Sequence, residues 1–429
     1  MSHKILRRIV LFFVSFFLFS SSSVVYCQSK LIISKSKDII RQIKKENTIY
    51  IIKYVYDLKG NTLIVPINCQ LDFQGGKIIN GSVIGNGTGI SAGRERIFEK
   101  VTLNGSWSNS KVFSEWLDFN DGLKVDNSHN FKNLMLLCQG ESFTHLYMQK
   151  GVFYCSVLKG SSNIKVPSNV YWHNSATIQQ LPTDLPKYSL VLIKQASNVT
   201  IDGGEFVGDV QTHYGSEGEW GHGIKVSGGT NVVLKNLACR EFWGDGIDLI
   251  EGEYVNAISA GVGICENILI DSVRCLYNRR QGLSIEAAKK VLVRNSEFAY
   301  TGKYKKTAPG AGIDIEPWCT NELKIDNIRI YNSKIHNNQS SPDLCLYPNL
   351  VSVIRKTSQG NSAVNRISIE KCHIGKMSLF GANSVNIEDC EIEAISQYKY
   401  GKNIRMNNCS IKRKSDIKSR DGLTMKRCK

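Results

Sequence analysis

The sequence predicts an all-β fold, a right-handed parallel β-helix in which short strands stack as successive coils of a solenoid. Two recurring phrases predict it. One is an apolar–polar–apolar phrase ending in cysteine near the C-terminus, and the other is a glycine-anchored phrase in the middle of the chain. Alternation within each phrase indicates strands, and a repeat of roughly twenty residues indicates one set of strands per coil.

The cysteine phrase predicts an internal column of side chains. Its copies start 18 to 19 residues apart, at Ile367, Val385, Ile404 and Leu423, and they end at Cys372, Cys390, Cys409 and Cys428. Parallel stacking places equivalent residues about 4.8 Å apart. We expect free thiols packed as small hydrophobic groups. Disulfides between adjacent coils are the alternative, because this spacing falls in the range of about 4.4–6.8 Å that a disulfide bridges.

The first residues have the layout of a secretory signal peptide. Lys4, Arg7 and Arg8 precede an apolar run, Ile9–Phe19, that is too short to span a bilayer. We expect residues 1–27 to be removed after Cys27, which makes the mature protein secreted or periplasmic. A lipid anchor on Cys27 is the alternative, and no later stretch predicts a membrane span.

The rest of the chain divides into two parts. Residues 28–111 contain short strands broken by glycine turns and predict a small N-terminal β module. Residues 112–429 predict the β-helix. The spacing of Phe131, Leu134 and Leu137 predicts a short amphipathic helix that caps the first coil, because an open solenoid end exposes unpaired backbone.

This helix and the strand-like stretch Leu146–Tyr154 resemble the capping region of the pectin-lyase-like β-helix superfamily, and the resemblance covers residues 112–429. The phrases Asn278–Ile285 and Gly310–Trp318 resemble phrases of polysaccharide-active β-helices. The resemblance implies a protein that acts on or binds polysaccharide. It assigns no catalytic residue, because the superfamily contains hydrolases, lyases and adhesins.

The glycine-anchored phrase occurs four times, at residues 221–227, 244–250, 280–286 and 310–316, and it predicts one polar face. Its apolar positions point into the core, and the intervening residues point outward. The outward columns are Lys225, Asp248, Ser284 and Asp314; Ser227, Ile250, Glu286 and Glu316; and, before the shared glycine, His222, Asp245, Gln281 and Ala311.

These columns supply the candidate site. Asp248 and Asp314 lie two coils apart, roughly 9–10 Å between backbones, which suits the two carboxyls of an inverting glycosidase. Crowded carboxyls should also raise one pKa and create a general acid. The predicted catalytic residues are Asp248, Asp314, Glu316, Glu286, Asp245, His222 and Arg280. The predicted substrate-binding residues are Lys225, Arg279, Gln281, Trp220, Trp243 and Trp318, whose indoles could stack on sugar rings.

A formal net charge of +16 favours an anionic partner, and export argues against nucleic acid. We therefore expect an exported enzyme that cleaves the glycosidic bonds of an acidic polysaccharide. Hydrolysis is favoured over β-elimination because carboxylates outnumber cations on the face. A lyase would neutralise the substrate carboxylate either with cations such as Arg279, Arg280 and Lys225 or with Ca²⁺, which Asp245, Asp248 and Asp314 could hold, although no spacing in the sequence indicates a metal site. A non-catalytic carbohydrate-binding or adhesion protein is the alternative.

Overall fold

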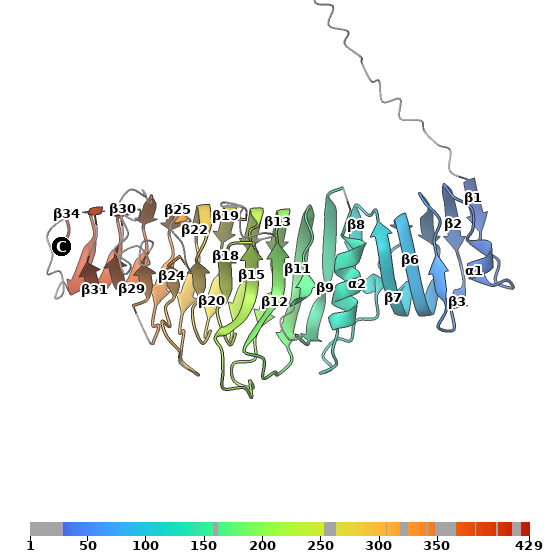
Figure 1. Ribbon diagram of the computed structural model, residues 1–429, viewed down its shortest axis with the longest axis horizontal. Helices are drawn as coiled ribbons and strands as arrows, with labels where there is room; N and C mark the ends of the chain where they lie inside the picture. Colours follow the sequence, from blue (N-terminus) through green and yellow to red (C-terminus); the bar gives the residue numbers. More distant parts are fainter. Residues whose placement is uncertain are drawn as a thin grey trace, which may run out of the picture.

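The computed structural model confirms a right-handed parallel β-helix, drawn as one row of stacked strands in Figure 1. It describes residues 29–140, 142–157, 162–252, 263–305, 307–317, 325–339, 342–347, 366–381, 383–399, 402–413 and 422–429. The expected signal peptide and Trp318 lie outside these ranges. No helix in the described part of the chain is long and apolar enough to cross a membrane.

The N-terminal strands form a parallel sheet of their own. It contains β1 (Ser29–Ile32), β2 (Thr48–Ile52), β3 (Val55–Asp57), β4 (Thr62–Ile64), β5 (Gln70–Phe73), β6 (Lys77–Ser91) and β7 (Phe98–Trp107), with the short helix α1 (Ile39–Gln42) after β1. The larger sheet starts with β8 (Lys111–Phe113), which precedes the 3-10 turn η1 (Ser114–Trp116).

The larger sheet wraps into three faces. Face A consists of β8, β9 (Thr144–Cys155), β11 (Val170–Gln180), β13 (Ser197–Asp202), β16 (Thr230–Lys235), β19 (Cys265–Asp271), β22 (Ala288–Arg294), β25 (Ile325–Tyr331), β28 (Ile367–Glu370), β30 (Asn383–Glu388), β32 (Lys402–Asn407) and β34 (Leu423–Lys426). Face B consists of β14 (Glu205–Val207), β17 (Ala238–Arg240), β20 (Arg274–Leu276), β23 (Glu297–Ala299), β26 (Lys334–His336) and then β29 (His373–Phe380), β31 (Glu391–Lys399) and β33 (Ser410–Arg413). Face C consists of β10 (Ser162–Lys165), β12 (Lys187–Lys194), β15 (Trp220–Ser227), β18 (Ile247–Ile250), β21 (Leu283–Ile285), β24 (Ile313–Ile315) and β27 (Leu344–Leu346), and it continues into the end of β29.

Apolar columns fill the interior. Along face A the pairings stack Ile201, Leu234, Ile270, Val293 and Ile330, and each of these side chains is fully buried. Each inward residue therefore packs on its counterpart one coil away, about 4.8 Å along the axis. This column explains the period-2 pattern of the sequence.

Asparagines recur near the start of three face A strands, β13, β16 and β19. Asn198, Asn231 and Asn267 have left-handed φ angles between 54° and 57°, a conformation that asparagine tolerates better than most residues. The Asn231 and Asn267 side-chain amides each donate to the Oδ1 of the preceding asparagine at 3.0 Å. These bonds tie successive coils together in one register.

The helix α2 (Ser128–Leu137) forms where the apolar spacing predicts it, but it does not cover a free end. Figure 1 shows it beside β7 and β8, between the two sheets. Asn133 on α2 accepts a hydrogen bond from the Leu103 amide at 3.1 Å and donates one to the Val101 carbonyl at 2.8 Å. The helix also contacts β10, the first strand of face C, so it covers the first coil as expected, and the N-terminal sheet lies on its other side.

The cysteine column contains free thiols, as expected. Cys372, Cys390 and Cys409 are buried and unbridged, and Cys428 at the last coil is partly exposed. The disulfide alternative is not observed for these residues.

The shared glycines set the geometry of face C. A Cβ added to Gly223 would lie 2.6 Å from the Gly246 carbonyl oxygen and 2.6 Å from the buried Phe242 ring, so this position faces the core. Gly246 and Gly282 make the same approach to the glycine of the next coil, at 2.8 and 2.5 Å. The following residue, Ile224 in the first copy, also points inward and is fully buried. Because two consecutive residues face the core, the residues on both sides of the pair point outward.

We predict that Gly246→Ala lowers the free energy of unfolding by about 1–3 kcal/mol, because its methyl group would lie 2.7 Å from Asn278 Nδ2 and 2.8 Å from the Gly282 carbonyl oxygen. Thermal unfolding followed by circular dichroism measures the effect. Gly89→Ala is the matched control, since the nearest atom to its added Cβ is 3.5 Å away. Equal melting temperatures for the two variants would show that the close approach does not constrain the coil.

Candidate active site on face C

The structure confirms the predicted register of face C. Strand pairing aligns Lys225 with Asp248, Asp248 with Ser284, and Ser284 with Asp314. In the column before the glycines, the Gly223 amide donates to the Asp245 carbonyl at 2.9 Å and the Gly246 amide to the Gln281 carbonyl at 3.0 Å. The Glu316 amide donates to the Ile285 carbonyl at 3.1 Å, which places Glu316 next to Glu286. We call Asp245, Asp248, Glu286, Asp314 and Glu316 the carboxylate cluster.

Asp245 lies between Arg280 and His222. Its Oδ2 lies 2.9 Å from Arg280 Nη1 and 3.3 Å from His222 Nδ1. Burial opposes ionisation of Asp245, but Arg280 and His222 outweigh it, and the pKa of Asp245 is lowered. Burial likewise works against the charge of Arg280, and Asp245 outweighs it, so the pKa of Arg280 is raised. Asp245 and Arg280 therefore form an ionised pair.

Asp248 is the next carboxyl of the cluster and is 1% exposed. Its Oδ2 lies 3.3 Å from Lys225 Nζ and 3.6 Å from His222 Nε2. His222 thus lies between Asp245 and Asp248, with one ring nitrogen toward each. These contacts provide positive charge on one side of the Asp248 carboxylate.

Asp314 is in a different environment and is 2% exposed. Its Oδ2 accepts a 2.5 Å hydrogen bond from Gln281 Nε2, and Gln281 Oε1 accepts one from Arg280 at 3.2 Å. Burial and the neighbouring charge of Glu316 raise the pKa of Asp314 well above its ordinary value. A carboxyl with a raised pKa keeps its proton near neutral pH and can donate it.

Glu286 is a second carboxyl with a strongly raised pKa. Burial is the main cause, and the charge of Asp248 adds to it. Burial also raises the pKa of Glu316, against the lowering effect of Arg280. The main charged neighbour of Glu286 is Asp248, and Glu316 acts chiefly on Asp314.

Four carboxylate oxygens of the cluster are buried without a hydrogen-bond partner among the described residues: Asp245 Oδ1, Asp248 Oδ1, Glu286 Oε2 and Asp314 Oδ1. A buried polar atom left unpaired costs free energy, and most such atoms in folded proteins are paired. Their concentration on one face makes the carboxylate cluster the candidate site.

Three of the expected substrate-binding residues have other roles. Trp243 is 3% exposed and lies between the His213 ring and the Arg279 guanidinium, each 3.8 Å from it, so it cannot stack on a sugar. Arg279 also donates to the Gly218 carbonyl at 2.8 Å, away from the cluster. Gln281 is fully buried and positions Asp314.

Two insertions beside face C, one before β15 and one after β23, pack against each other. Lys305, in the insertion after β23, donates to the His213 carbonyl at 2.9 Å and lies 4.9 Å from the Trp243 ring. Glu219, in the insertion before β15, lies 3.2 Å from Arg280 Nε. Glu219 thus holds Arg280 only through this one ion pair, and Lys305 packs on Trp243. Glu219 was not foreseen, because no repeated phrase marks it.

A groove leads to the cluster along face C. Its volume is about 1050 Å³, and it runs from β7 and α2 across β10 and β12 to β15 and the end of β18. Lys225 and His222 line it and also contact the cluster, and Trp220, 39% exposed, lines it as well. The other basic residues of the groove are His129, Lys132, Lys165, Lys187 and Lys194, which the sequence interpretation missed because no glycine-anchored phrase contains them.

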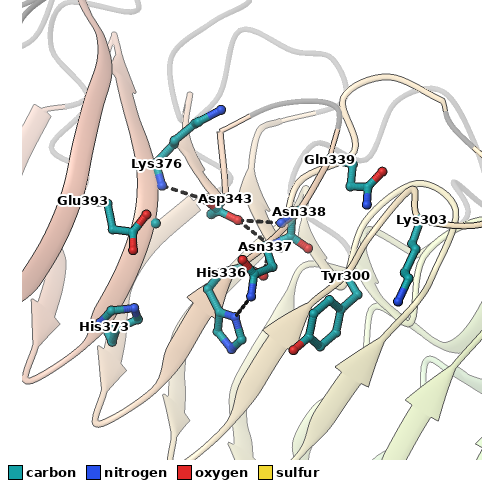
Figure 2. Close-up of a pocket in the computed structure, with 11 residues that line it drawn as sticks. Tyr300, Lys303, His336, Asn337, Asn338, Gln339, Asp343, His373, Lys376 and Glu393 are labelled. Carbon is teal, nitrogen blue, oxygen red and sulfur yellow. Dashed lines mark hydrogen bonds between the residues drawn. The ribbon is translucent and has the colours of Figure 1, made fainter. Parts of the chain in front are cut away.

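A second hollow of about 640 Å³ lies beside face B and is shown in Figure 2. Its buried acid, Asp343, is already paired: Oδ1 accepts from Asn338 and Oδ2 accepts from the Lys376 amide at 2.7 Å. His336 contacts Asn337 in the same view. Because Asp343 maintains the turn, this hollow lacks the unpaired carboxyl oxygens found on face C.

No three His, Cys, Asp or Glu side chains in the described ranges are arranged to hold a metal ion. Asp245 and Asp248, which were expected to bind Ca²⁺ in a lyase, already face Arg280, His222 and Lys225. The positive charges of Arg280 and Lys225 would repel a divalent ion. The residues therefore do not fit a calcium site.

Fold and site together define a parallel β-helix protein with a buried acidic cluster on one face. No family model matches the chain. It is similar to the uncharacterized protein YclG of Bacillus subtilis, with 26% identity over 237 residues, or 51% of this chain and 40% of the relative. The SPbeta prophage-derived uncharacterized protein YorA of Bacillus subtilis is 24% identical over 233 residues, 50% of this chain and 40% of the relative. The chain thus spans about two fifths of the length of these curated relatives.

The solved structures similar to this chain include the tailspike protein gp49 of Acinetobacter baumannii bacteriophage Fri1, a capsular polysaccharide depolymerase. It is 13% identical with a TM-score of 0.49, over 74% of this chain and 57% of that chain.

We predict that Asp314→Asn raises the melting temperature at pH 7 by about 2 °C. The folded protein keeps a proton on Asp314 at pH values where the unfolded chain, with an aspartate pKa of about 3.9, releases it. Stability is therefore lost as pH rises above the unfolded pKa, and the amide removes this penalty. The gain should shrink as the pH is lowered toward 4.

Asp271→Asn is the control of opposite sign, because Arg294 and Asn295 lower the pKa of Asp271 against its burial. It should destabilise the protein at pH 7, and less so as the pH falls through the lowered pKa of Asp271. An Asp314→Asn variant that melts below the parent protein at pH 7 would contradict a protonated Asp314.

Proposed function

We propose that this protein is a glycoside hydrolase that cleaves a polysaccharide bound along face C. The observation that carries the proposal is the set of buried, unpaired carboxylate oxygens on neighbouring coils. Hydrolysis of a glycosidic bond needs one carboxyl that donates a proton and one that receives a proton. Asp314, with its raised pKa, suits the donor, and Asp248, beside Lys225 and His222, suits the acceptor.

The spacing of these residues supports an inverting reaction. Asp248 and Asp314 are separated by two coil steps, about 9.6 Å between backbones. Carboxyls of inverting enzymes lie roughly 6.5–9.5 Å apart, which leaves room for a water molecule beside the sugar. Retaining enzymes hold them closer, at about 5–5.5 Å.

The reaction would proceed in one displacement. Asp314 gives its proton to the glycosidic oxygen as the bond from that oxygen to the anomeric carbon breaks. Water attacks the anomeric carbon from the opposite face, and Asp248 takes the proton that the water loses. Gln281 holds the Asp314 side chain, while Arg280 and His222 keep Asp245 ionised beside the site. Glu286 is the second candidate for the donor, because its pKa is also strongly raised.

The polysaccharide is proposed to be acidic, in line with the net charge of +16. Residues 1–27 would export the protein, so that the enzyme meets its polymer outside the cytoplasm. A carbohydrate-binding protein without turnover is the second candidate, favoured by the near-complete burial of Asp248 and Asp314.

We predict that the purified protein releases reducing ends from at least one polysaccharide of a panel of acidic and neutral glycans, without new absorbance near 235 nm. Asp248→Asn and Asp314→Asn should each lower kcat by at least about 100-fold, as loss of general acid or base catalysis does. Both should retain the parent circular dichroism spectrum.

Asp202→Asn is the matched control, since Asp202 is an outward acid on face A that bonds Tyr171. Its activity should stay close to that of the parent. Reducing ends together with absorbance near 235 nm would indicate β-elimination and refute hydrolysis. Binding without any new reducing end would support the second candidate, a carbohydrate-binding protein without turnover.

A further inference from the structure

The charge of the outward side chains on face C changes sign along the axis of the β-helix. In one outward column the successive residues are Lys165, Leu192, Lys225, Asp248, Ser284 and Asp314. In the next column Lys194 aligns with Ser227 and Ile250, and the column continues to Glu286 and Glu316. The early coils of face C are therefore basic and the later coils acidic, and the change falls between Lys225 and Asp248.

The groove occupies the basic part. It is lined by Lys132 from α2, Lys165 from β10, Lys187 and Lys194 from β12, and Lys225 from β15. Lys132, Lys165 and Lys187 make no ion pair with any described residue. Uncompensated lysines in a concave surface create a positive potential that an anionic ligand can neutralise.

The groove also has the shape and the apolar surface that a polymer needs. From Lys165 to Asp248 there are three coil steps, about 14 Å. Leu192 and Val166 provide apolar lining between the lysines, and Trp220 offers a partly exposed indole ring. An aromatic ring beside cations suits a carbohydrate chain that carries anionic groups.

We infer that the groove is an extended binding site for an anionic polysaccharide, which lies over β10, β12 and β15 with its reacting bond at the change of sign beside Asp248. This inference rests on the proposed function and specifies its substrate. The lysines bind carboxylate or sulfate groups of several consecutive sugars on one side of the cleavage point. The described face C strands beyond β15, from β18 to β27, contain no lysine, which disfavours a chain that extends equally to both sides.

The test is binding to alginate, polygalacturonate and chondroitin sulfate, with amylose as the neutral glycan, measured by isothermal titration calorimetry in the Asp314→Asn background. The variant Lys132→Gln/Lys165→Gln/Lys187→Gln should bind the preferred anionic glycan at least about tenfold more weakly. Its affinity should also depend less steeply on NaCl concentration.

The control is Lys53→Gln/Lys59→Gln/Lys111→Gln, which removes the same charge from exposed lysines outside the groove. It should bind like the parent. Equal weakening in both triple variants, tight binding of amylose, or no binding of any anionic glycan would overturn the inference.

The outcomes separate this inference from the proposed function. Binding that depends on the groove lysines, without turnover by the parent protein, would support the groove as a binding site and refute the proposed hydrolase activity. If the protein cleaves a neutral glycan, and the triple lysine variant cleaves it at the same rate, the hydrolase activity is supported and the binding role of the groove is refuted.

Discussion

The whole arrangement depends on the close approach of one glycine to the next across face C. At Gly223, Gly246 and Gly282 the backbone carbonyl of the following coil occupies the space where a Cβ would lie. This contact fixes the register of the coils, and it turns two consecutive residues toward the core. His222 and Lys225 consequently both face outward, as do Asp245 and Asp248, although strict alternation would place only one of each pair there.

The electrostatics of the site follow from that register. Parallel stacking forces like residues into columns about 4.8 Å apart, so several acids must be buried side by side. Burial of an isolated charge is costly, and the structure resolves the conflict in two ways. Asp245 stays ionised against Arg280 and His222, whereas Asp314 and Glu286 have raised pKa values and can remain neutral. Acid and base character is thus divided among residues of neighbouring columns on one face.

The sequence was sufficient to predict the fold and the columns of face C, because a repeat carries its own alignment. It could not predict that Trp243 and Arg279 pack against each other away from the substrate site, because this packing depends on two insertions that meet around His213. It also missed Lys132, Lys165 and Lys187, because α2 joins the groove only through tertiary packing and because β10 and β12 lack the glycine phrase. Residues inside the repeat were predictable, and residues recruited from outside it were not.

The central claim is that register alone brings Asp248 and Asp314 to either side of one glycosidic bond at the end of a basic groove. A crystal structure of the Asp314→Asn protein with an anionic oligosaccharide tests it most directly. The account predicts a sugar chain over β10, β12 and β15, with residue 314 within hydrogen-bond distance of a glycosidic oxygen and Asp248 facing the adjoining anomeric carbon. An oligosaccharide bound to face A or face B, or side chains 248 and 314 pointing to different sides of the rod, would contradict it.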